Sequence, residues 1–296
     1  MISARRFISL LILLLFTLSF TPNSDLSNPQ VISVAFIDIG QGDATLIRDG
    51  AGFDVLVDGG KKSSGEDLLA YLHQVGVDDL EVIIATHADR DHIGGFIPLL
   101  ESDDIQIENV LYNGYPGTTE LWADFVNAVE DEGLILVPTQ YPEIHSWGAI
   151  SIQVLNPLDD LIDPEQNKAS VVLLLDYAQI SILLPADIDS TVENQLLTRV
   201  TAIQPDILKV AHHGSKYSTS QIFLDNIQPQ EAIISVGANA YGHPAPETLA
   251  RLNSSEINTW RTDFAGTIML SSDGFDYTIL PRFTFLPLSF YFPPDP

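Results

Sequence analysis

The sequence predicts an α/β protein in which two mixed β-sheets pack together and helices cover their outer faces, an αββα sandwich. After residue 30 the chain opens with short apolar runs bounded by Gly, Asp and Asn, and strands then alternate with helical patterns. Hairpins followed by strand–helix alternation, twice over, are typical of mixed sheets with helices outside. With 296 residues and 45% hydrophobic content, the chain has enough apolar material for a full globular core.

The first half of the chain supplies the clearest element signals. Leu68, Leu69 and Leu72 fall on one face of a helix that follows Gly60. The continuous apolar run at 82–85 indicates a strand buried on both faces, which implies a sheet covered by helices. The other elements expected here are strands at 31–38, 44–48, 53–58 and 110–112 and helices over 93–100 and 121–130.

The second half repeats this order, and the sequence between the halves contains no low-complexity linker. We therefore expect one domain with two similar lobes. The elements expected in the second half are strands at 150–155, 170–176, 179–184, 206–210, 231–236, 257–260, 266–270 and 275–280 and helices over 191–200, 221–226 and 246–252.

Charge and composition exclude several classes of function. Forty acidic residues against 13 Lys and Arg give a formal charge of -27, so the overall field repels polyanions and anionic membranes. Stable binding of duplex DNA is not expected, because contacts to its backbone need a basic footprint. The absence of cysteine excludes thiolate metal sites, disulfides and cysteine nucleophiles. Imidazole, carboxylate and hydroxyl groups must carry any chemistry.

The N-terminus has the layout of a secretory signal. Arg5 and Arg6 precede an uncharged apolar run, and polar residues follow it. The run from 7 to 20 is shorter than the roughly 20 residues that a membrane-spanning helix needs, and no other stretch is long enough. We expect a secreted or periplasmic protein, or a membrane-anchored one if the leader is not cleaved. The predicted organisation is a leader at 1–30, one folded domain at 31–281 and a Pro-rich apolar tail at 282–296.

A cluster of potential metal ligands follows the buried strand at 82–85. His87, Asp89, Asp91 and His92 lie within six residues. Neutral imidazole and carboxylate suit Zn²⁺ or Mn²⁺, and alternate positions on a tight loop can face two adjacent ions. The alternative is a solvated turn in which Asp91 caps the next helix, but a cap needs only one carboxylate. We therefore expect a metal centre at this strand end.

The pattern H-x-D-x-D-H, after an apolar strand and before I-G-G, resembles the metallo-β-lactamase superfamily. Asp89 stands where the commoner form H-x-H-x-D-H has its second His. This substitution resembles the extracytoplasmic hydrolase domain of ComEC-type DNA-uptake proteins, and so do the segments DIGQGDA at 38–44, LVDGG at 56–60 and KVAHHGS at 209–215. The resemblance runs from about residue 31 to 280. It implies the metallo-β-lactamase fold.

The resemblance also implies a centre of two divalent metal ions, Zn²⁺ or Mn²⁺. The residues that it assigns are His87 and Asp89 for the first ion, Asp91, His92 and His212 for the second, and Asp187 as the carboxylate bridging both. Asn167 holds the place of the usual third-motif histidine, so the first site is expected to be oxygen-rich, weaker and better suited to Mn²⁺. Asp58 is either an orienter of a metal-bound histidine or an ordinary turn residue.

Four residues are candidates for catalytic roles. Asp91, between the two ligand pairs, is expected to orient the nucleophile as well as bind metal. We assign His213 to substrate contact, because two adjacent residues do not easily point to the same metal, although His213 in place of His212 as the ligand stays open. Lys216 is expected to meet a scissile phosphate or its leaving group. His243 has the same expected role, with an ordinary loop hydrogen bond as the alternative.

Two divalent ions about 3.5–4 Å apart can hold a bridging hydroxide at neutral pH and clamp the oxygens of an ester. We therefore expect an exported, binuclear phosphodiesterase or nuclease. Its acidity conflicts with polyanion binding, and a small or single-stranded substrate eases that conflict; Arg90, Lys209 and Lys216 are the basic residues near the motifs. The alternatives are hydrolysis of a lactone, β-lactam or other acyl ester on the same metals, and a binding module that has lost its metals.

Overall fold

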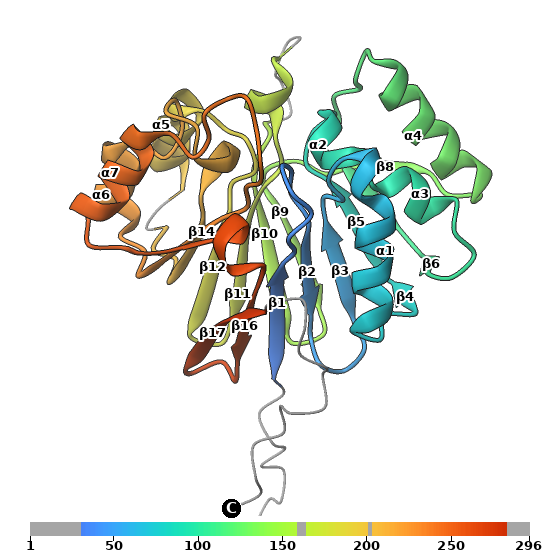
Figure 1. Ribbon diagram of the computed structural model, residues 1–296, viewed down its shortest axis with the longest axis horizontal. Coiled ribbons are helices and arrows are strands. Elements are labelled where there is room, and N and C mark those ends of the chain that lie inside the picture. The colour runs from blue at the N-terminus through green and yellow to red at the C-terminus, as the bar shows by residue number, and fades with distance from the viewer. Residues whose placement is uncertain (1–30, 159–163, 201–202, 283–296) are drawn as a thin grey trace, which may run out of the picture.

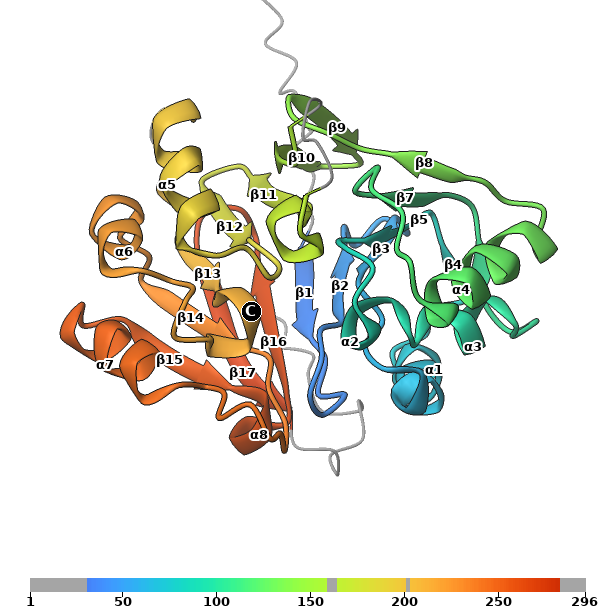
Figure 2. The same cartoon turned by 90° about the horizontal axis from the view of Figure 1, so that it is seen from above.

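The computed structural model describes residues 31–158, 164–200 and 203–282. Two large β-sheets pack against each other, and helices cover the outer face of each (Figures 1 and 2). The predicted αββα class is confirmed. The predicted leader at 1–30 and the predicted tail beyond residue 282 lie outside the described residues.

The first sheet has eight strands in the order β17-β16-β1-β2-β3-β5-β7-β8. Neighbours from β17 to β3 are antiparallel, and neighbours from β3 to β8 are parallel. This division follows from the connections, since short turns can join antiparallel strands whereas parallel strands need a crossover. The bounds are β1 Ile32–Phe36, β2 Thr45–Arg48, β3 Asp54–Val57, β5 Val82–Ala85, β7 Val110–Tyr112, β8 Leu136–Pro138, β16 Thr267–Ser272 and β17 Tyr277–Arg282.

The second sheet has seven strands in the order β15-β14-β13-β12-β11-β10-β9. It repeats the plan of the first, with antiparallel strands from β9 to β12 and parallel strands from β12 to β15. The bounds are β9 Glu143–Trp147, β10 Ile150–Asn156, β11 Val172–Tyr177, β12 Ile180–Leu184, β13 Ile207–Lys209, β14 Glu231–Ile234 and β15 Asn258–Arg261. A separate pair of two-residue strands is formed by β4 Asp79–Leu80 and β6 Gln106–Ile107.

Helices α1 to α4 lie on the side of the first sheet and α5 to α7 on the side of the second (Figure 2). Within the described ranges, no helix combines the length and apolar character needed to cross a membrane. The bounds are α1 Gly65–Gln74, α2 Arg90–Ile93, α3 Phe96–Leu100, α4 Glu120–Asp131, α5 Ser190–Arg199, α6 Gln221–Ile227, α7 Pro246–Ser254 and α8 Thr262–Ala265, with 3₁₀ turns η1 Lys62–Ser64, η2 Gln166–Ala169 and η3 Ala211–Gly214.

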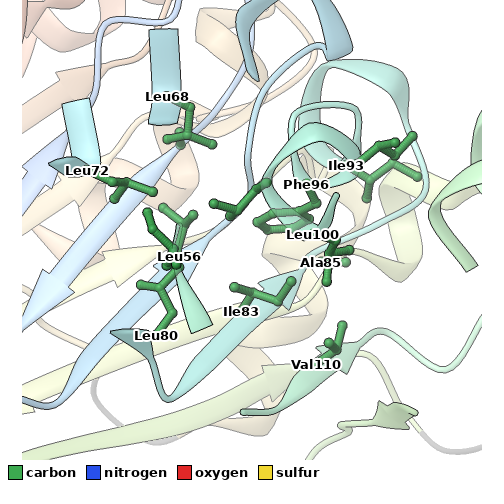
Figure 3. Packing of buried hydrophobic residues seen from close by; sticks show 14 of the residues in the cluster. Leu56, Leu68, Leu72, Leu80, Ile83, Ala85, Ile93, Phe96, Leu100 and Val110 are labelled. Carbon is green, nitrogen blue, oxygen red and sulfur yellow. The ribbon is translucent and has the colours of Figure 1, made fainter. Parts of the chain in front are cut away.

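Strand β5 shows why the chain forms layers. Ile83 and Ala85 join the core under α1, α3 and α4, whereas Val82 and Ile84 face the core between the two sheets. Figure 3 shows the first of these cores, where Ile83 of β5 and Phe96 of α3 lie in one cluster. The apolar run at 82–85 is therefore buried on both faces, as predicted, and it holds the loop that follows between two packed layers.

The predicted helix over 93–100 is two helices, because α2 ends before Gly94 and α3 begins after Gly95. The backbone of Gly59 lies against this break. The Gly59 amide donates to the His92 carbonyl at 2.7 Å, and a Cβ on Gly95 would lie 1.9 Å from the Gly59 carbonyl oxygen. Close backbone approach therefore requires glycine here and fixes α2 against the end of β3.

The sequence analysis does not predict strands β8 and β9. They are the last strands at one end of each sheet. Side chains such as Val137 and Ile144 are exposed on them. Edge strands bury little apolar surface, so their pattern is weak in sequence.

Candidate metal centre

The candidate ligands lie where strands of both sheets end. Asp58 directly follows β3 and Thr86 directly follows β5 in the first sheet, while Asp187 follows β12 and His212 follows β13 in the second. Because β3 is parallel to β5 and β12 is parallel to β13, the carboxyl ends within each pair meet at one edge of their sheet. In open α/β sheets this edge is where ligands bind.

Asp58 fixes the orientation of His92. Its carboxylate accepts hydrogen bonds from the Thr86 amide at 2.9 Å and the Thr86 hydroxyl at 2.8 Å, and it lies 2.7 Å from His92 Nδ1. Nδ1 of His92 is therefore held by a carboxylate and Nε2 faces the interior of the site. This is the arrangement in which a carboxylate orients a metal-binding histidine. The geometry favours the orienting role for Asp58 over that of a turn residue.

Four imidazoles converge on one oxygen of Asp187. From Asp187 Oδ2, the Nε2 atom of His92 is 3.3 Å away, that of His212 3.6 Å, that of His213 3.9 Å and that of His87 4.0 Å. Asp187 is buried, as are three of the four rings. The predicted bridging carboxylate thus lies at the centre of the predicted ligands.

The two remaining carboxylates of the loop flank this centre. Asp89 Oδ2 lies 3.7 Å from His87 Nε2, and Asp91 Oδ2 lies 3.7 Å from His213 Nε2. The Asp89 side chain is 47% exposed and that of Asp91 18% exposed, so both stand at the mouth of the cluster and not beneath it. A ligand entering from solvent meets these two carboxylates first.

Buried polar atoms in the cluster lack hydrogen bonds of normal geometry among the described residues: Nε2 of His87, His92 and His213, and Oδ1 of Asp187. Leaving such atoms unpaired costs free energy, so a group that satisfies them is expected. Two ligands of a tetrahedral Zn²⁺ lie roughly 3.4 Å apart at ordinary Zn–N distances. The separations of 3.3–4.0 Å around Asp187 therefore fit a shared cation. In addition, ligand atoms of Asp43, His92, Asp187 and His213 all lie within 4.8 Å of one another.

Neighbouring charges shift the pKa values of His92 and Asp187 in opposite directions. Burial lowers the pKa of His92, but the Asp187 and Asp58 carboxylates outweigh it and hold that pKa well above its usual value. Burial raises the pKa of Asp187, but His92 and His213 outweigh it and hold that pKa well below its usual value. Because a metal-binding histidine must be deprotonated at the ligating nitrogen, a divalent cation at His92 competes with protons there.

Sequence reasoning assigned no role to Asp43, which lies beneath the centre. Its carboxylate forms a buried ion pair with Lys209, and it lies 3.6 Å from His213 Nδ1 and 3.9 Å from His92 Nδ1. Burial raises the pKa of Asp43, but the charges of Lys209, His213 and His92 together outweigh it and lower that pKa. The available signal was a lysine at the end of the apolar strand β13 and an aspartate two residues before β2. Lys209 is only 3% exposed, so it is not available to attract a nucleic acid.

The adjacent histidines of η3 differ in their surroundings. His213 is buried, and its Nδ1 lies 2.9 Å from the Ser235 carbonyl oxygen, to which it donates when Nε2 is free. The His212 side chain is 31% exposed and its Nδ1 lies 3.4 Å from Asn167 Nδ2. The geometry places His213, where we expected His212, beside Asp91.

His243 and Tyr241 lie at the mouth, and Lys216 does not. His243 and Tyr241 line a cleft of about 140 Å³ together with residues of the cluster. The His243 ring centroid is 5.4 Å from that of His212. Lys216 is exposed and extends over the ring of Tyr217 at 5.0 Å, and it does not line this cleft.

A larger hollow of about 610 Å³ adjoins the cleft and shares Asp89, Asp91 and Tyr241 with it. Volumes of this size hold small-molecule ligands. Its other lining residues include Arg90 as well as Glu120 and Asp124 of α4. The approach to the cluster therefore carries both signs of charge, with acidic groups in excess.

Curated proteins with similar sequences include "ComE operon protein 3" of Bacillus subtilis (strain 168), 32% identical over 256 residues that make up 79% of this chain and 32% of that protein. "Recombination protein 2" of Haemophilus influenzae is 30% identical over 269 residues, 88% of this chain and 31% of that protein. The chain thus spans about a third of the length of these relatives. The resemblance to ComEC-type proteins is confirmed.

Solved structures with similar folds include the metallo-beta-lactamase fold protein YhfI from Bacillus subtilis, with a TM-score of 0.55 at 12% identity over 82% of this chain and 100% of that one. Tm1679, described as a metal-dependent hydrolase of the beta-lactamase superfamily, gives a TM-score of 0.52 at 12% identity over 80% of this chain and 98% of that one. The family model described as "Metallo-beta-lactamase superfamily" matches residues 37–238, the stretch that holds every residue of the cluster. The chain therefore belongs to the metallo-beta-lactamase superfamily.

Proposed function

We propose that this chain is a binuclear metal-dependent phosphodiesterase that acts outside the cytoplasm. The observation that carries the proposal is the convergence of four imidazoles on Asp187, with buried Nε2 atoms that lack hydrogen bonds of normal geometry among the described residues. Two ions bound here would supply an activated water and neutralise the oxygens of the substrate ester. The number of ligands around a single carboxylate supports two ions rather than one.

The chain's own residues prepare the site for this reaction. Asp58 holds His92 in one orientation, and the Ser235 carbonyl does the same for His213. Asp91, which lies at the mouth and 3.7 Å from His213 Nε2, would orient a water as well as bind metal. Beside the same cleft, His243 is placed to meet the leaving group, and burial together with the neighbouring His212 and His213 lowers its pKa.

A phosphodiester substrate is supported by the names of the relatives. They include "Recombination protein 2" and "Competence protein ComA", and recombination is a reaction of nucleic acid. The acidic lining by Glu120 and Asp124, together with the net charge of -27, favours a small or single-stranded substrate over a duplex.

We expect the metal-loaded protein to hydrolyse bis-(p-nitrophenyl) phosphate and single-stranded oligonucleotides faster than duplex DNA. The measurement is a panel of initial rates with Mn²⁺ or Zn²⁺, which also includes lactones, β-lactams and simple acyl esters. Asp91→Asn is the internal control, since it should abolish turnover of the true substrate while the protein stays folded. Efficient cleavage of lactones or β-lactams with every phosphodiester untouched would replace this proposal by the acyl-hydrolase alternative. A chain that binds no metal at saturating Mn²⁺ or Zn²⁺ would point to the binding-module alternative.

Export is a separate part of the proposal, and it rests on the basic start and short apolar run of residues 1–30. We expect the protein purified from its native host to begin near residues 20 to 30, or to be membrane-bound with the leader intact. N-terminal sequencing of each cell fraction measures this. An intact Met1 on protein from the soluble cytoplasmic fraction would contradict it.

A further inference from the structure

His212 and His213 have an unusual backbone. Their φ angles are 52° and 53°, so two consecutive non-glycine residues are left-handed. This conformation is costly for residues with a Cβ and persists only where the surroundings hold it. Because of this backbone the rings of His212 and His213 diverge, with planes 79° apart and centroids separated by 6.1 Å. Adjacent residues can therefore reach two different sides of Asp187.

The side that His213 reaches is the side of Asp91. His213 Nε2 lies 3.7 Å from Asp91 Oδ2, and the Asp91 carbonyl accepts a hydrogen bond from the Asp43 amide at 3.0 Å. Asp43 itself lies 3.6 Å from the other nitrogen of the His213 ring. With His92 and Asp187, His213 forms a compact set of potential ligands.

The side that His212 reaches is the side of His87. Its Nδ1 lies beside Asn167 in η2, and η2 is bonded to the loop that carries His87. The Ala88 amide donates to the Gln166 side chain at 3.1 Å, and the Val171 amide donates to the Thr86 carbonyl at 2.8 Å. In the described ranges no ring nitrogen of His212 lies within 4.0 Å of an Asp91 carboxylate oxygen, whereas His212 Nε2 lies 3.6 Å from Asp187 Oδ2.

We propose that the adjacent histidines bind different ions. His212 completes the ligand set of His87, Asp89 and Asp187. His213 completes the ligand set of Asp91, His92 and Asp187. His212 thus supplies a fourth protein ligand, and a second imidazole beside His87, to the first ion. This inference rests on the binuclear centre proposed above. It replaces our expectation that the first site is poor in nitrogen.

The same geometry gives Asn167 a role as a positioning residue. An amide can be turned over, which exchanges its oxygen and nitrogen at the same position. With Oδ1 toward His212, Asn167 accepts from Nδ1–H and leaves the Nε2 lone pair directed at Asp187. Asn167 then orients a ligand without being one, as Asp58 does for His92.

The test is metal binding by single glycine variants, because glycine tolerates the left-handed backbone and offers no ligand. The wild-type chain is expected to bind two equivalents of Mn²⁺, seen by elemental analysis and as a spin-coupled EPR spectrum. His212→Gly and His213→Gly should each keep one equivalent and show the six-line spectrum of an isolated ion. Asn167→Ala should weaken only the ion that His212→Gly loses, by about 10–100-fold. Circular dichroism and thermal melting check that each variant is folded.

The control is His243→Gly, which removes an imidazole from the same cleft and should retain two coupled ions. Two equivalents with unchanged affinity in folded His212→Gly would overturn the inference and leave the binuclear function intact. Fewer than two equivalents in the wild type would instead overturn the binuclear function. Loss of both ions in His212→Gly, with His213→Gly keeping two, would show that the assignment to separate ions is wrong.

Discussion

Asp187→Asn should leave the chain unable to hold either ion of the proposed centre and should lower kcat/KM by about 10³-fold or more, since Lewis-acid activation contributes several kcal/mol. The reason is position: Nε2 atoms of four histidines lie within 4.0 Å of one Asp187 oxygen, so the two proposed ligand sets would share this carboxylate. Asparagine keeps the shape but removes the charge that offsets the ions. Elemental analysis after dialysis and steady-state kinetics on a phosphodiester measure the two effects.

Asp189→Asn provides the matched control two residues away. The Asp189 side chain accepts hydrogen bonds from the Thr191 and Val192 amides and caps α5. Because asparagine is also a good cap, this variant should lose well under about 1 kcal/mol of stability and keep both ions. Retention of two equivalents by Asp187→Asn would show that the carboxylate is not shared.

The layers of the fold were predictable because local signals agreed with the packing. The run at 82–85 is apolar at every position, and it contributes side chains to the cores on both of its faces. The break between α2 and α3 was not predictable, because it depends on the approach of Gly59, more than 30 positions earlier, to the backbone of Gly95. Periodicity reports which face is buried and carries no information about which backbone will lie against it.

The candidate metal centre was also predictable only where the signal lies within one short segment of the sequence. The loop from His87 to His92 is visible in sequence because four ligand-type side chains within one short segment have little structural explanation. The partition of His212 and His213 was not visible, since it depends on two consecutive left-handed residues. Asp43 was missed for a related reason, because its partner Lys209 is 166 positions away and only the folded chain brings them together.

The buried ion pair of Lys209 and Asp43 leads to the largest expected effect on stability. Lys209→Met should lower the free energy of unfolding by about 3–5 kcal/mol, because it removes one partner and leaves an uncompensated carboxylate in the interior. Asp43 is 1% exposed and cannot recover its charge interaction from water. Urea unfolding in the presence of a chelator measures the effect separately from metal binding.

Two further variants show whether the loss of stability comes from breaking the Lys209–Asp43 ion pair or from removing any lysine near the site. Lys209→Met combined with Asp43→Asn should recover most of the loss, since no charge is then left unpaired, and the pair's coupling energy is the difference from the sum of the single variants. Lys168→Met removes a partly exposed lysine that lies 3.3 Å from Glu165 and 3.9 Å from Asp189, and it should cost less than about 1 kcal/mol. If Lys209→Met costs no more than Lys168→Met, the ion pair with Asp43 does not hold the base of the metal centre.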